Sequence, residues 1–327
     1  MPEKLPGTEK LRPGVIIVGS VTADLTTFSQ RLPSRGETIH GDEFTLVLGG
    51  KGANQAVAVG LAGADAHFVA CVGTDLFQNL IFDGLRSAGV ATEHVRAIDG
   101  ARTGIAHIRV DDSAENDIVM VPLANEQLSV EQIDQAFAAC SATSSVLLTQ
   151  LEIPADLSSY AIRRARESGL TVILDPAPAV PLDDSIWAGI DIVTPNETEA
   201  RILTGIEVTD QESATKAGRW FLDRGAKAAV ITLAAAGALL VTNDEITAFP
   251  AIPVISVDTT AAGDSFAGYL GAGIALGMPL HDAIRLAGAA GALTVTKRGA
   301  SPSLPERRDV EALMSTNAIP ANPSERN

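Results

Sequence analysis

One short segment carries the strongest chemical signal in this sequence. It covers residues 258–266 and reads Asp-Thr-Thr-Ala-Ala-Gly-Asp-Ser-Phe. The apolar residues 252–257 before it predict a strand, and a long helix is expected from Ala262, so that small residues occupy the strand-to-helix turn. Free backbone N–H groups and the positive end of the helix dipole meet at such a turn, and Gly263 lets a ligand approach closely. The segment therefore predicts a binding site for an anion such as phosphate.

Asp264 lies in the first turn of this predicted helix. A carboxylate beside a bound phosphate is electrostatically unfavourable, so its presence needs a chemical reason. Accepting the proton of an attacking hydroxyl group is such a reason, and it predicts that Asp264 is a general base. An ordinary capped helix with an acidic first turn would have the same sequence, so the segment alone leaves both interpretations open.

A second polar pair follows another predicted strand. Asn196 and Glu199 are three residues apart on a helix expected to start at Pro195, so both side chains should face one way at the end of strand 191–193. The pair could bind a ligand at the carboxyl end of that strand. It could equally be a capping pair that only stabilises the helix start.

The elements that must position these residues are those of an α/β protein. Aliphatic runs with little alternation predict strands covered on both faces, as in a mostly parallel sheet between helices. The predicted strands are 15–21, 67–72, 146–151, 171–174, 191–193 and 229–233. The predicted helices are 53–61, 129–139 with Ser129 as N-cap, 155–167, 262–276 and 280–296.

Two stretches, 37–48 and 103–121, break this pattern. They alternate polar and apolar residues as half-exposed antiparallel strands do, and they predict a small accessory sheet. No internal repeat or long linker interrupts the sequence, so we expect a single domain over residues 14–315, with flexible tails at 1–13 and 316–327.

Composition limits the possible partners. The 327 residues include 40 acidic and 24 basic side chains, and the formal charge of −16 repels both nucleic acid and anionic membrane surfaces. The longest apolar run, 228–241, is too short to span a bilayer, and residues 1–13 lack the apolar centre of a signal peptide. Cys71 and Cys140 lie in separate apolar stretches, which favours buried thiols in a reducing cytoplasm over a disulfide.

Several common signatures do not fit. Residues 50–55 begin like a dinucleotide-binding fingerprint, but Gln55 stands where the third glycine belongs, and Gly52 stands where a P-loop needs Ser or Thr. The five histidines form no pair with zinc-ligand spacing. An esterase with Ser265 as nucleophile remains a rival, although the motif lacks its final glycine and no histidine is obviously placed to serve it.

Several separated segments, in the right order, resemble the PfkB carbohydrate kinases. Residues 258–264 are similar to the C-terminal signature of that family, and residues 49–56, Gly-Gly-Lys-Gly-Ala-Asn-Gln-Ala, are similar to the N-terminal signature of its ribokinase branch. The likeness continues through Gln-Leu-Glu at 150–152, Asp-Pro-Ala-Pro at 175–178 and Pro-Asn-Glu-Thr-Glu-Ala at 195–200. It covers about residues 15–313 and implies a three-layer ribokinase-like fold with a β-sheet lid.

The resemblance also implies roles for individual residues. Asp264 would be the catalytic base, and the backbone amides of Ala261, Ala262 and Gly263 would hold the transferring phosphoryl group, which agrees with the physical argument above. Carboxylates and amides suit a polyol because they replace its water shell. The implied sugar site comprises Thr22, Asp24, Gly50, Lys51, Asn54, Glu152 and Asp264. Without the resemblance, Asp24 near the end of the first strand could merely close a turn, and Glu152 could be a solvated loop residue.

The implied cofactors are ATP, Mg²⁺ and K⁺. Asn196 and Glu199 would contact the nucleotide phosphates, with Glu199 reaching Mg²⁺ through water, in keeping with the water shell that this ion retains. Further implied nucleotide contacts are Thr232, Ala234, Gly237, Gly263 and Gly288. The implied K⁺ cage, made of carbonyl groups and one carboxylate, comprises Asp258, Thr260, Thr294, Lys297, Gly299 and Ser303.

Three departures from the family pattern bear on details. Thr22 replaces the usual asparagine of the first loop, which leaves the identity of the sugar open. The usual Gly-Ser-x-Gly nucleotide loop reads Ala-Ala-Ala-Gly at 234–237, so ATP is expected to bind less tightly. Gly288 is small where a larger polar residue is common, so a loose preference for the nucleotide base is expected.

These observations predict an ATP-dependent kinase that phosphorylates the 5-hydroxyl of D-ribose in the cytoplasm. By the same resemblance, the lid should cover the sugar and pair with its counterpart in a homodimer. One alternative is a PfkB-family kinase for another substrate, such as deoxyribose, fructose or a ribonucleoside. Another is a sugar sensor on the same fold that has no ATP turnover.

Overall fold

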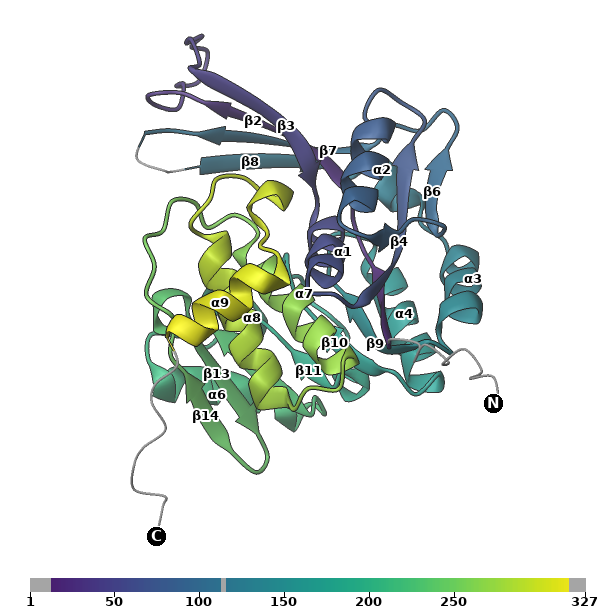
Figure 1. Cartoon of the computed structure of the whole chain (residues 1–327), viewed down its shortest axis with the longest axis vertical. Coiled ribbons are helices and arrows are strands. Elements are labelled where there is room, and N and C mark those ends of the chain that lie inside the picture. The colour runs from purple at the N-terminus through teal and green to yellow at the C-terminus, as the bar shows by residue number, and fades with distance from the viewer. Residues whose placement is uncertain (1–12, 113–115, 318–327) are drawn as a thin grey trace, which may run out of the picture.

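The computed structural model describes residues 13–112 and 116–317 (Figure 1). Its main sheet has the order β14-β13-β12-β11-β10-β9-β1-β4-β5, with β6 also paired to β4. The strands are β1 (Gly14–Val18), β4 (Asp65–Gly73), β5 (Val90–Ala91), β6 (Val95–Ile98), β9 (Ser144–Thr149), β10 (Thr171–Leu174), β11 (Ile192–Val193), β12 (Ala228–Thr232), β13 (Ala238–Thr242) and β14 (Ile246–Phe249). All pairs are parallel except β12–β13 and β13–β14, which confirms the predicted α/β class.

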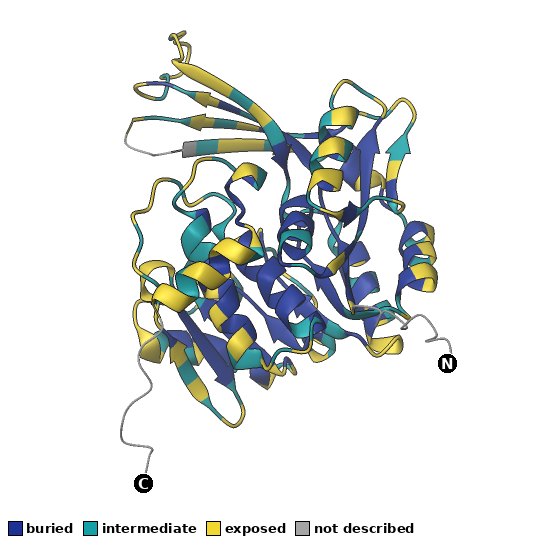
Figure 2. Cartoon of the chain, in the orientation of Figure 1, coloured by how far each residue is buried: buried dark blue, intermediate teal, exposed yellow. Residues whose placement is uncertain are grey.

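Helices cover both faces of this sheet. One face packs against α1 (Lys51–Leu61), α2 (Gln78–Ser87), α7 (Ala262–Ala275), α8 (Leu280–Thr294) and α9 (Arg307–Thr316). The other face packs against α3 (Val130–Cys140), α4 (Ala155–Glu167), α5 (Glu197–Thr204) and α6 (Gln211–Asp223). Neighbouring residues of β1 show why helices must cover both faces of the sheet. Ile16 and Ile17 point to opposite faces, each belongs to a different hydrophobic core, and both are fully buried. Figure 2 shows this three-layer core in dark blue.

Short elements and caps complete the body. The 3₁₀ helices are η1 (Leu123–Gln127), η2 (Asp184–Gly189), η3 (Ala234–Ala236) and η4 (Ser301–Ser303). The predicted N-cap at Ser129 is confirmed, since its hydroxyl oxygen accepts a hydrogen bond from the Gln132 backbone N–H. Of the predicted tails, residues 1–12 and 318–327 lie outside the described residues, and α9 extends through Thr316.

A second sheet forms the lid, with the order β3-β2-β7-β8. Its strands are β2 (Thr22–Phe28), β3 (Glu43–Gly49), β7 (Gly104–Val110) and β8 (Asn116–Val121), and Figure 1 shows the sheet projecting from the body at the top. The prediction of strand structure over 37–42 was wrong, because β3 begins only at Glu43. The prediction also missed β2, which pairs antiparallel with β3 but parallel with β7. Only three residues separate β1 from β2, which is too short a segment to predict a turn that divides the two strands.

The predicted strand at 252–257 does not form. No residue of this segment pairs with a sheet, and Ile255 is 86% exposed. The segment is instead held at the residue that follows α8, because the backbone N–H groups of Val257 and Asp258 donate to the carbonyl oxygen of Val295. Its β-branched residues favour an extended chain, but β14 is the edge of the main sheet and the chain must cross from there to α7.

Candidate active site

The candidate site lies where the parallel strands end and α1 and α7 begin. Glu152 follows β9, Asp175 follows β10 and Asn196 follows β11, so three consecutive strands of the sheet present polar side chains beyond their carboxyl ends. This edge is where open α/β sheets bind their ligands. The side chains of Asn54 from α1 and Asp264 from α7 meet at the same place, 2.8 Å apart from amide nitrogen to carboxylate oxygen.

The start of α7 has the free amides that an anion hole requires. Ala261 adopts a left-handed conformation with φ of 60°, and the Ala262 N–H donates back to the Thr259 carbonyl. The amides of Gly263 and Asp264 have no acceptor within residues 13–112 and 116–317. A Cβ atom at Gly263 would meet nothing within 4 Å, so an approaching ligand has room there. Of the amides implied by the resemblance, that of Gly263 is therefore free and that of Ala262 is occupied, and the geometry permits anion binding at Gly263 and Asp264.

Asp264 is only 5% exposed and is held by two carboxamides from consecutive residues of α1. Asn54 donates from Nδ2 to one carboxylate oxygen at 2.8 Å, and Gln55 donates from Nε2 to the other at 3.4 Å. The neighbouring Ser265 is fully buried, and its hydroxyl has no hydrogen-bond partner among the described residues. Within residues 13–112 and 116–317, no base is hydrogen-bonded to the Ser265 hydroxyl, which argues against the esterase alternative.

Glu152 and Lys51 link the sheet to α1. The Glu152 carboxylate accepts hydrogen bonds from the Ser20 hydroxyl at 2.6 Å and from the Lys51 backbone N–H at 2.9 Å. A Cβ atom on Gly52 would collide with the backbone of residues 19–20, so a glycine is needed where α1 meets this turn. Glu152 is therefore an anchored side chain, and the alternative of a freely solvated loop residue does not apply.

The ammonium group of Lys51 lies among carboxylates. Burial lowers the pKa of Lys51, but the charges of Asp264, Asp175 and Glu152 raise it more, so that the net shift is upward. The pKa of Asp175 is raised well above its usual range, mainly by burial and against the influence of Lys51. The site thus holds one ammonium group and several carboxyl groups close together, as is common at sites that bind charged or hydroxyl-bearing substrates.

Asp24 belongs to the lid, contrary to its predicted place near the end of the first strand. It lies on β2, where the Thr22 hydroxyl donates to its carboxylate at 2.6 Å, and a Cβ atom on Gly49 of the adjacent strand would overlap that carboxylate. Burial raises the pKa of Asp24 to about 6, the Thr22 hydrogen bond opposes this, and the charges of Glu152 and Asp264 add to it. The lid thereby faces the other acidic groups of the site.

Asn196 and Glu199 form a capping box, which was the alternative left open by the sequence. The Asn196 carbonyl oxygen Oδ1 accepts from the Glu199 N–H, Glu199 Oε2 accepts from the Asn196 N–H, and α5 begins at Glu197 rather than at Pro195. These two bonds use Glu199 Oε2 and Asn196 Oδ1, and they hold both side chains in place at the start of α5. Burial raises the pKa of Glu199.

The predicted nucleotide residues lie along neighbouring elements. Asn196 forms a parallel bridge with Thr232, the last residue of β12, which brings two of them side by side. Ala234 has a φ of 44° and Gly237 a φ of 98°, so the turn between β12 and β13 is tight. Gly288 lies within α8, and a Cβ atom there would meet nothing within 4 Å.

The residues of the implied cation cage surround the turn before α7. Asp258 accepts hydrogen bonds from the Thr260 N–H and hydroxyl at 2.9 and 2.7 Å, and from the Gly299 N–H at 2.8 Å. The hydroxyls of Thr294 and Ser303 donate to backbone carbonyls, and Lys297 is exposed. A cation here would therefore rely on carbonyl oxygens and the Asp258 carboxylate, a donor set that fits K⁺. The described residues contain no group of three or more His, Cys, Asp or Glu side chains arranged to hold a metal ion.

Three buried residues of the site had not been singled out. Gln55 contacts Asp264, while Asp175 and Gln150 contact Gln55, and all three lie within the motifs quoted above. Asp175 directly follows β10, and a carboxylate at the end of a buried strand is the signal that could have identified it. Gln55 and Gln150 offered no such signal, because their side chains meet only after α1 has packed across the sheet.

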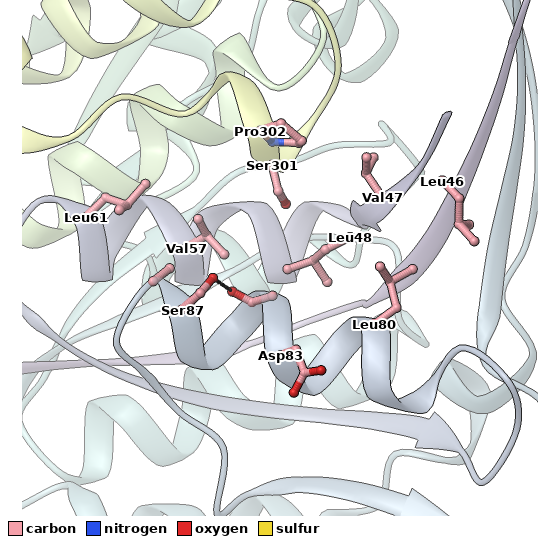
Figure 3. Close-up of a pocket in the computed structure, with 12 residues that line it drawn as sticks. Leu46, Val47, Leu48, Val57, Leu61, Leu80, Asp83, Ser87, Ser301 and Pro302 are labelled. Carbon is pink, nitrogen blue, oxygen red and sulfur yellow. Dashed lines mark hydrogen bonds between the residues drawn. The ribbon is translucent and has the colours of Figure 1, made fainter. Parts of the chain in front are cut away.

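A cavity of about 530 Å³ lies outside this site (Figure 3). It lies between β3, α1, α2 and η4. Its lining is largely apolar and includes Leu46, Leu48, Val57, Leu80, Ser301 and Pro302. None of the residues predicted to bind sugar, nucleotide or metal lines it. A smaller cavity, lined by Asp24, Thr26, Asp258, Thr260 and Gly299 among others, separates the lid from the turn before α7.

Comparison with known proteins gives consistent matches. The model for the pfkB family carbohydrate kinases matches residues 12–307. The ribokinase of Haemophilus influenzae is 39% identical over 299 residues, covering 91% of this chain and 97% of that protein. The deoxyribokinase of Salmonella typhimurium is 33% identical over 304 residues, covering 93% and 99%. The structure of Arabidopsis thaliana ribokinase complexed with ribose and ATP superposes with a TM-score of 0.85 at 31% identity, covering 93% of this chain and 99% of that one.

Proposed function

The chain belongs to the pfkB family of carbohydrate kinases, and we propose that it transfers the γ-phosphoryl group of ATP to the 5-hydroxyl of D-ribose. The products are D-ribose 5-phosphate and ADP. An ATP-dependent sugar kinase agrees with the family, and the choice of ribose is supported by the Haemophilus influenzae relative and by the ribose and ATP in the Arabidopsis thaliana complex. The observation that carries the proposal is a buried carboxylate, Asp264, beside free amides at a helix start.

In the proposed reaction Asp264 acts as the general base. Its carboxylate takes the proton from the 5-hydroxyl while the sugar oxygen attacks the γ-phosphorus and the bond to the β-phosphate oxygen breaks. The free amides of Gly263 and Asp264 point to where negative charge collects on the transferring group. Phosphoryl transfer needs little covalent help from a protein, so alignment and charge account for most of this catalysis.

The sugar is held between the body and the lid. Asp24, Asn54 and Glu152 accept from or donate to its hydroxyl groups, together with Thr22 and the segment Gly50–Lys51. Lys51 balances the carboxylates before substrate binds. Closure of the lid over the sugar excludes water that would compete for the γ-phosphate.

ATP lies along the ends of β11 and β12. Asn196 and Glu199 face its phosphates, and Thr232, Ala234, Gly237 and Gly288 shape the remaining nucleotide site. Mg²⁺ bound to the phosphates would neutralise charge during transfer, with Glu199 holding it through water. This assignment is supported by the capping box, which fixes both side chains beyond the end of β11.

The first test measures ADP release against a panel of sugars in the presence of Mg²⁺ and K⁺. We expect D-ribose to give the highest kcat/KM, with deoxyribose, fructose and ribonucleosides lower. Absence of ADP release with every sugar, despite measurable sugar binding, would favour the alternative of a sugar sensor and contradict the proposal.

Deoxyribose is the second candidate substrate. Thr22 is only 1% exposed and its hydroxyl donates to Asp24, so it can accept from a sugar hydroxyl but cannot donate to one. A site with one fewer donor discriminates less against a substrate lacking one hydroxyl group. The Salmonella typhimurium deoxyribokinase among the relatives supports this candidate. A kcat/KM for deoxyribose above that for ribose in the same panel would establish it.

K⁺ binds beside the anion hole in this proposal. The Asp258 carboxylate and carbonyl oxygens of Thr260, Thr294, Lys297, Gly299 and Ser303 would hold it, and the ion would add positive charge near the phosphoryl site. We expect turnover in K⁺ to exceed turnover in Na⁺ by about fivefold or more at constant ionic strength. Equal rates in the two salts would argue against the cation cage.

The lid also supports a homodimer. Phe44, Leu46, Val119 and Val121 lie on the same face of its strands and are all more than a third exposed, and an apolar sheet face of this kind is stabilised by a partner. We expect sedimentation velocity to show a dimer that Phe44→Glu dissociates. The control Ile202→Glu, which places the same charge at an exposed apolar residue of α5, should remain dimeric. A monomeric wild-type protein at micromolar concentration would contradict this proposal.

The proposed location is the cytoplasm. Cys71 and Cys140 are buried free thiols, as expected in a reducing compartment. No helix among the described residues has the length and apolar character needed to cross a membrane.

A further inference from the structure

Four buried polar side chains form a connected group behind the candidate base. Gln55 and Gln150 are completely buried, and Asp175 and Asp264 are each 5% exposed. Gln55 Nε2 lies 2.7 Å from Asp175 Oδ2 and 3.4 Å from Asp264 Oδ1. Gln55 Oε1 accepts a hydrogen bond from Gln150 Nε2. A single carboxamide therefore bridges two carboxyl groups and is itself held from behind.

This arrangement fixes which way the Gln55 carboxamide points. The donor from Gln150 keeps the carbonyl end of Gln55 away from the carboxyl groups, and the NH₂ end faces them. If the carboxamide rotated by half a turn, its NH₂ group would face the NH₂ group of Gln150, and Asp264 Oδ1 would lose its donor in a buried place.

Asn54 is held in the same manner on the other side of the base. Its Oδ1 accepts from the Ser301 hydroxyl at 2.8 Å, while its Nδ2 donates to Asp264 Oδ2 at 2.8 Å. Each oxygen of the Asp264 carboxylate thus receives one carboxamide donor from consecutive residues of α1. Two donors on separate oxygens define the plane of the carboxylate, which one donor alone would leave free to rotate.

We propose that Gln55 is a positioning residue for Asp264, and that Asp175 anchors Gln55 rather than acting as a second base. The inference rests on the proposed function and deepens it. The base is next to the site of the γ-phosphate, whose charge repels it. A carboxylate without a second donor would turn away from the phosphate and from the sugar hydroxyl, and the proton transfer would lose its alignment.

The test replaces Gln55 with Met, which has similar length and volume but no donor. We expect kcat to fall by about 10- to 100-fold while KM for the sugar and for ATP changes less than about threefold. The matched control is Gln132→Met on α3. Gln132 is also a buried glutamine, but its Nε2 donates to the backbone carbonyls of Ala70 and His94, and neither of these residues belongs to the candidate site. We expect the control variant Gln132→Met to lower the melting temperature and to leave kcat unchanged.

A role in folding alone predicts a different result. In that case Gln55→Met and Gln132→Met would both lower the melting temperature, and both would keep the wild-type kcat per folded molecule. If Gln55→Met does not fold, Gln150→Met tests the same group, because it removes only the donor behind Gln55. We expect from it a smaller loss of kcat in the same direction.

A crystal structure of Gln55→Met separates this inference from the proposed function, because it needs no substrate. We expect the Asp264 carboxylate to be rotated or present in two orientations. An unchanged orientation of Asp264, or an unchanged kcat, would overturn the inference. If the wild-type protein phosphorylated no sugar, the proposed function would fail, and the orientation of Asp264 in the crystal would still decide the role of Gln55.

Discussion

Asp264→Asn is expected to lower kcat by about 10³-fold while the protein still binds its sugar and ATP. An asparagine side chain cannot take the proton of the 5-hydroxyl, but it is the same size as aspartate. Its carbonyl oxygen can still accept from Asn54 Nδ2, and its NH₂ group replaces only the acceptor of the longer, 3.4 Å bond from Gln55, so the fold at the start of α7 should be kept. The free amides of Gly263 and residue 264 are unaffected, because they belong to the backbone.

The measurement is ADP release at saturating sugar and ATP, with calorimetry for sugar binding and circular dichroism for folding. The control is Asp244→Asn, which makes the same change at an exposed position between β13 and β14 and should leave kcat unchanged. Near-normal turnover by folded Asp264→Asn would refute the assignment of the base.

Asp24→Asn is expected to weaken sugar binding and to stabilise the fold. The charged carboxylate is a better acceptor for sugar hydroxyl groups than a neutral amide, so KM for the sugar should rise by about 10- to 100-fold. The same charge is costly in the absence of sugar, because Asp24 is buried between the lid and other carboxylates. Removing it exchanges function for stability, as is common at binding sites.

The pH dependence of stability tests this argument directly. Burial raises the pKa of Asp24 from 3.8 to about 6, so between these pH values the folded state binds the proton more tightly than the unfolded state does. The stabilisation from Asp24 is complete below pH 4 and is lost as the pH rises through 6. Asp24→Asn should therefore raise the free energy of unfolding at pH 7.5 by about 2 to 3 kcal/mol relative to its effect at pH 4. The measurement is chemical denaturation of both proteins at the two pH values. If Asp24→Asn changed the free energy of unfolding equally at pH 4 and pH 7.5, the argument would be contradicted.

Most of the body could be predicted because its signals are local. Continuous aliphatic runs identified the buried strands, and the side chains of Ile16 and Ile17 in opposite cores show the physical reason. Ser129 was identifiable as an N-cap from residue type and position alone. The segment before Asp264 was recognisable because small residues at a helix start have few other uses.

The errors arose where tertiary contacts decide the structure. The β-branched residues of 252–257 have strand propensity, but no neighbouring strand is available beyond β14. The lid strand β2 was missed because it follows β1 after only three residues. The sequence therefore predicts Asp24 near the end of the first strand, whereas the structure places it on the lid. Gln55 and Gln150 are 95 residues apart in sequence, and nothing local indicates that their side chains meet.

The most direct test of the account is a crystal structure with D-ribose and a non-hydrolysable ATP analogue bound. We predict that an Asp264 carboxylate oxygen lies within about 2.6 to 3.2 Å of the ribose 5-hydroxyl, with the amides of Gly263 and Asp264 directed at the γ-phosphate. A complex in which both ligands are bound but the Asp264 carboxylate points away from the hydroxyl and the phosphate would contradict the account.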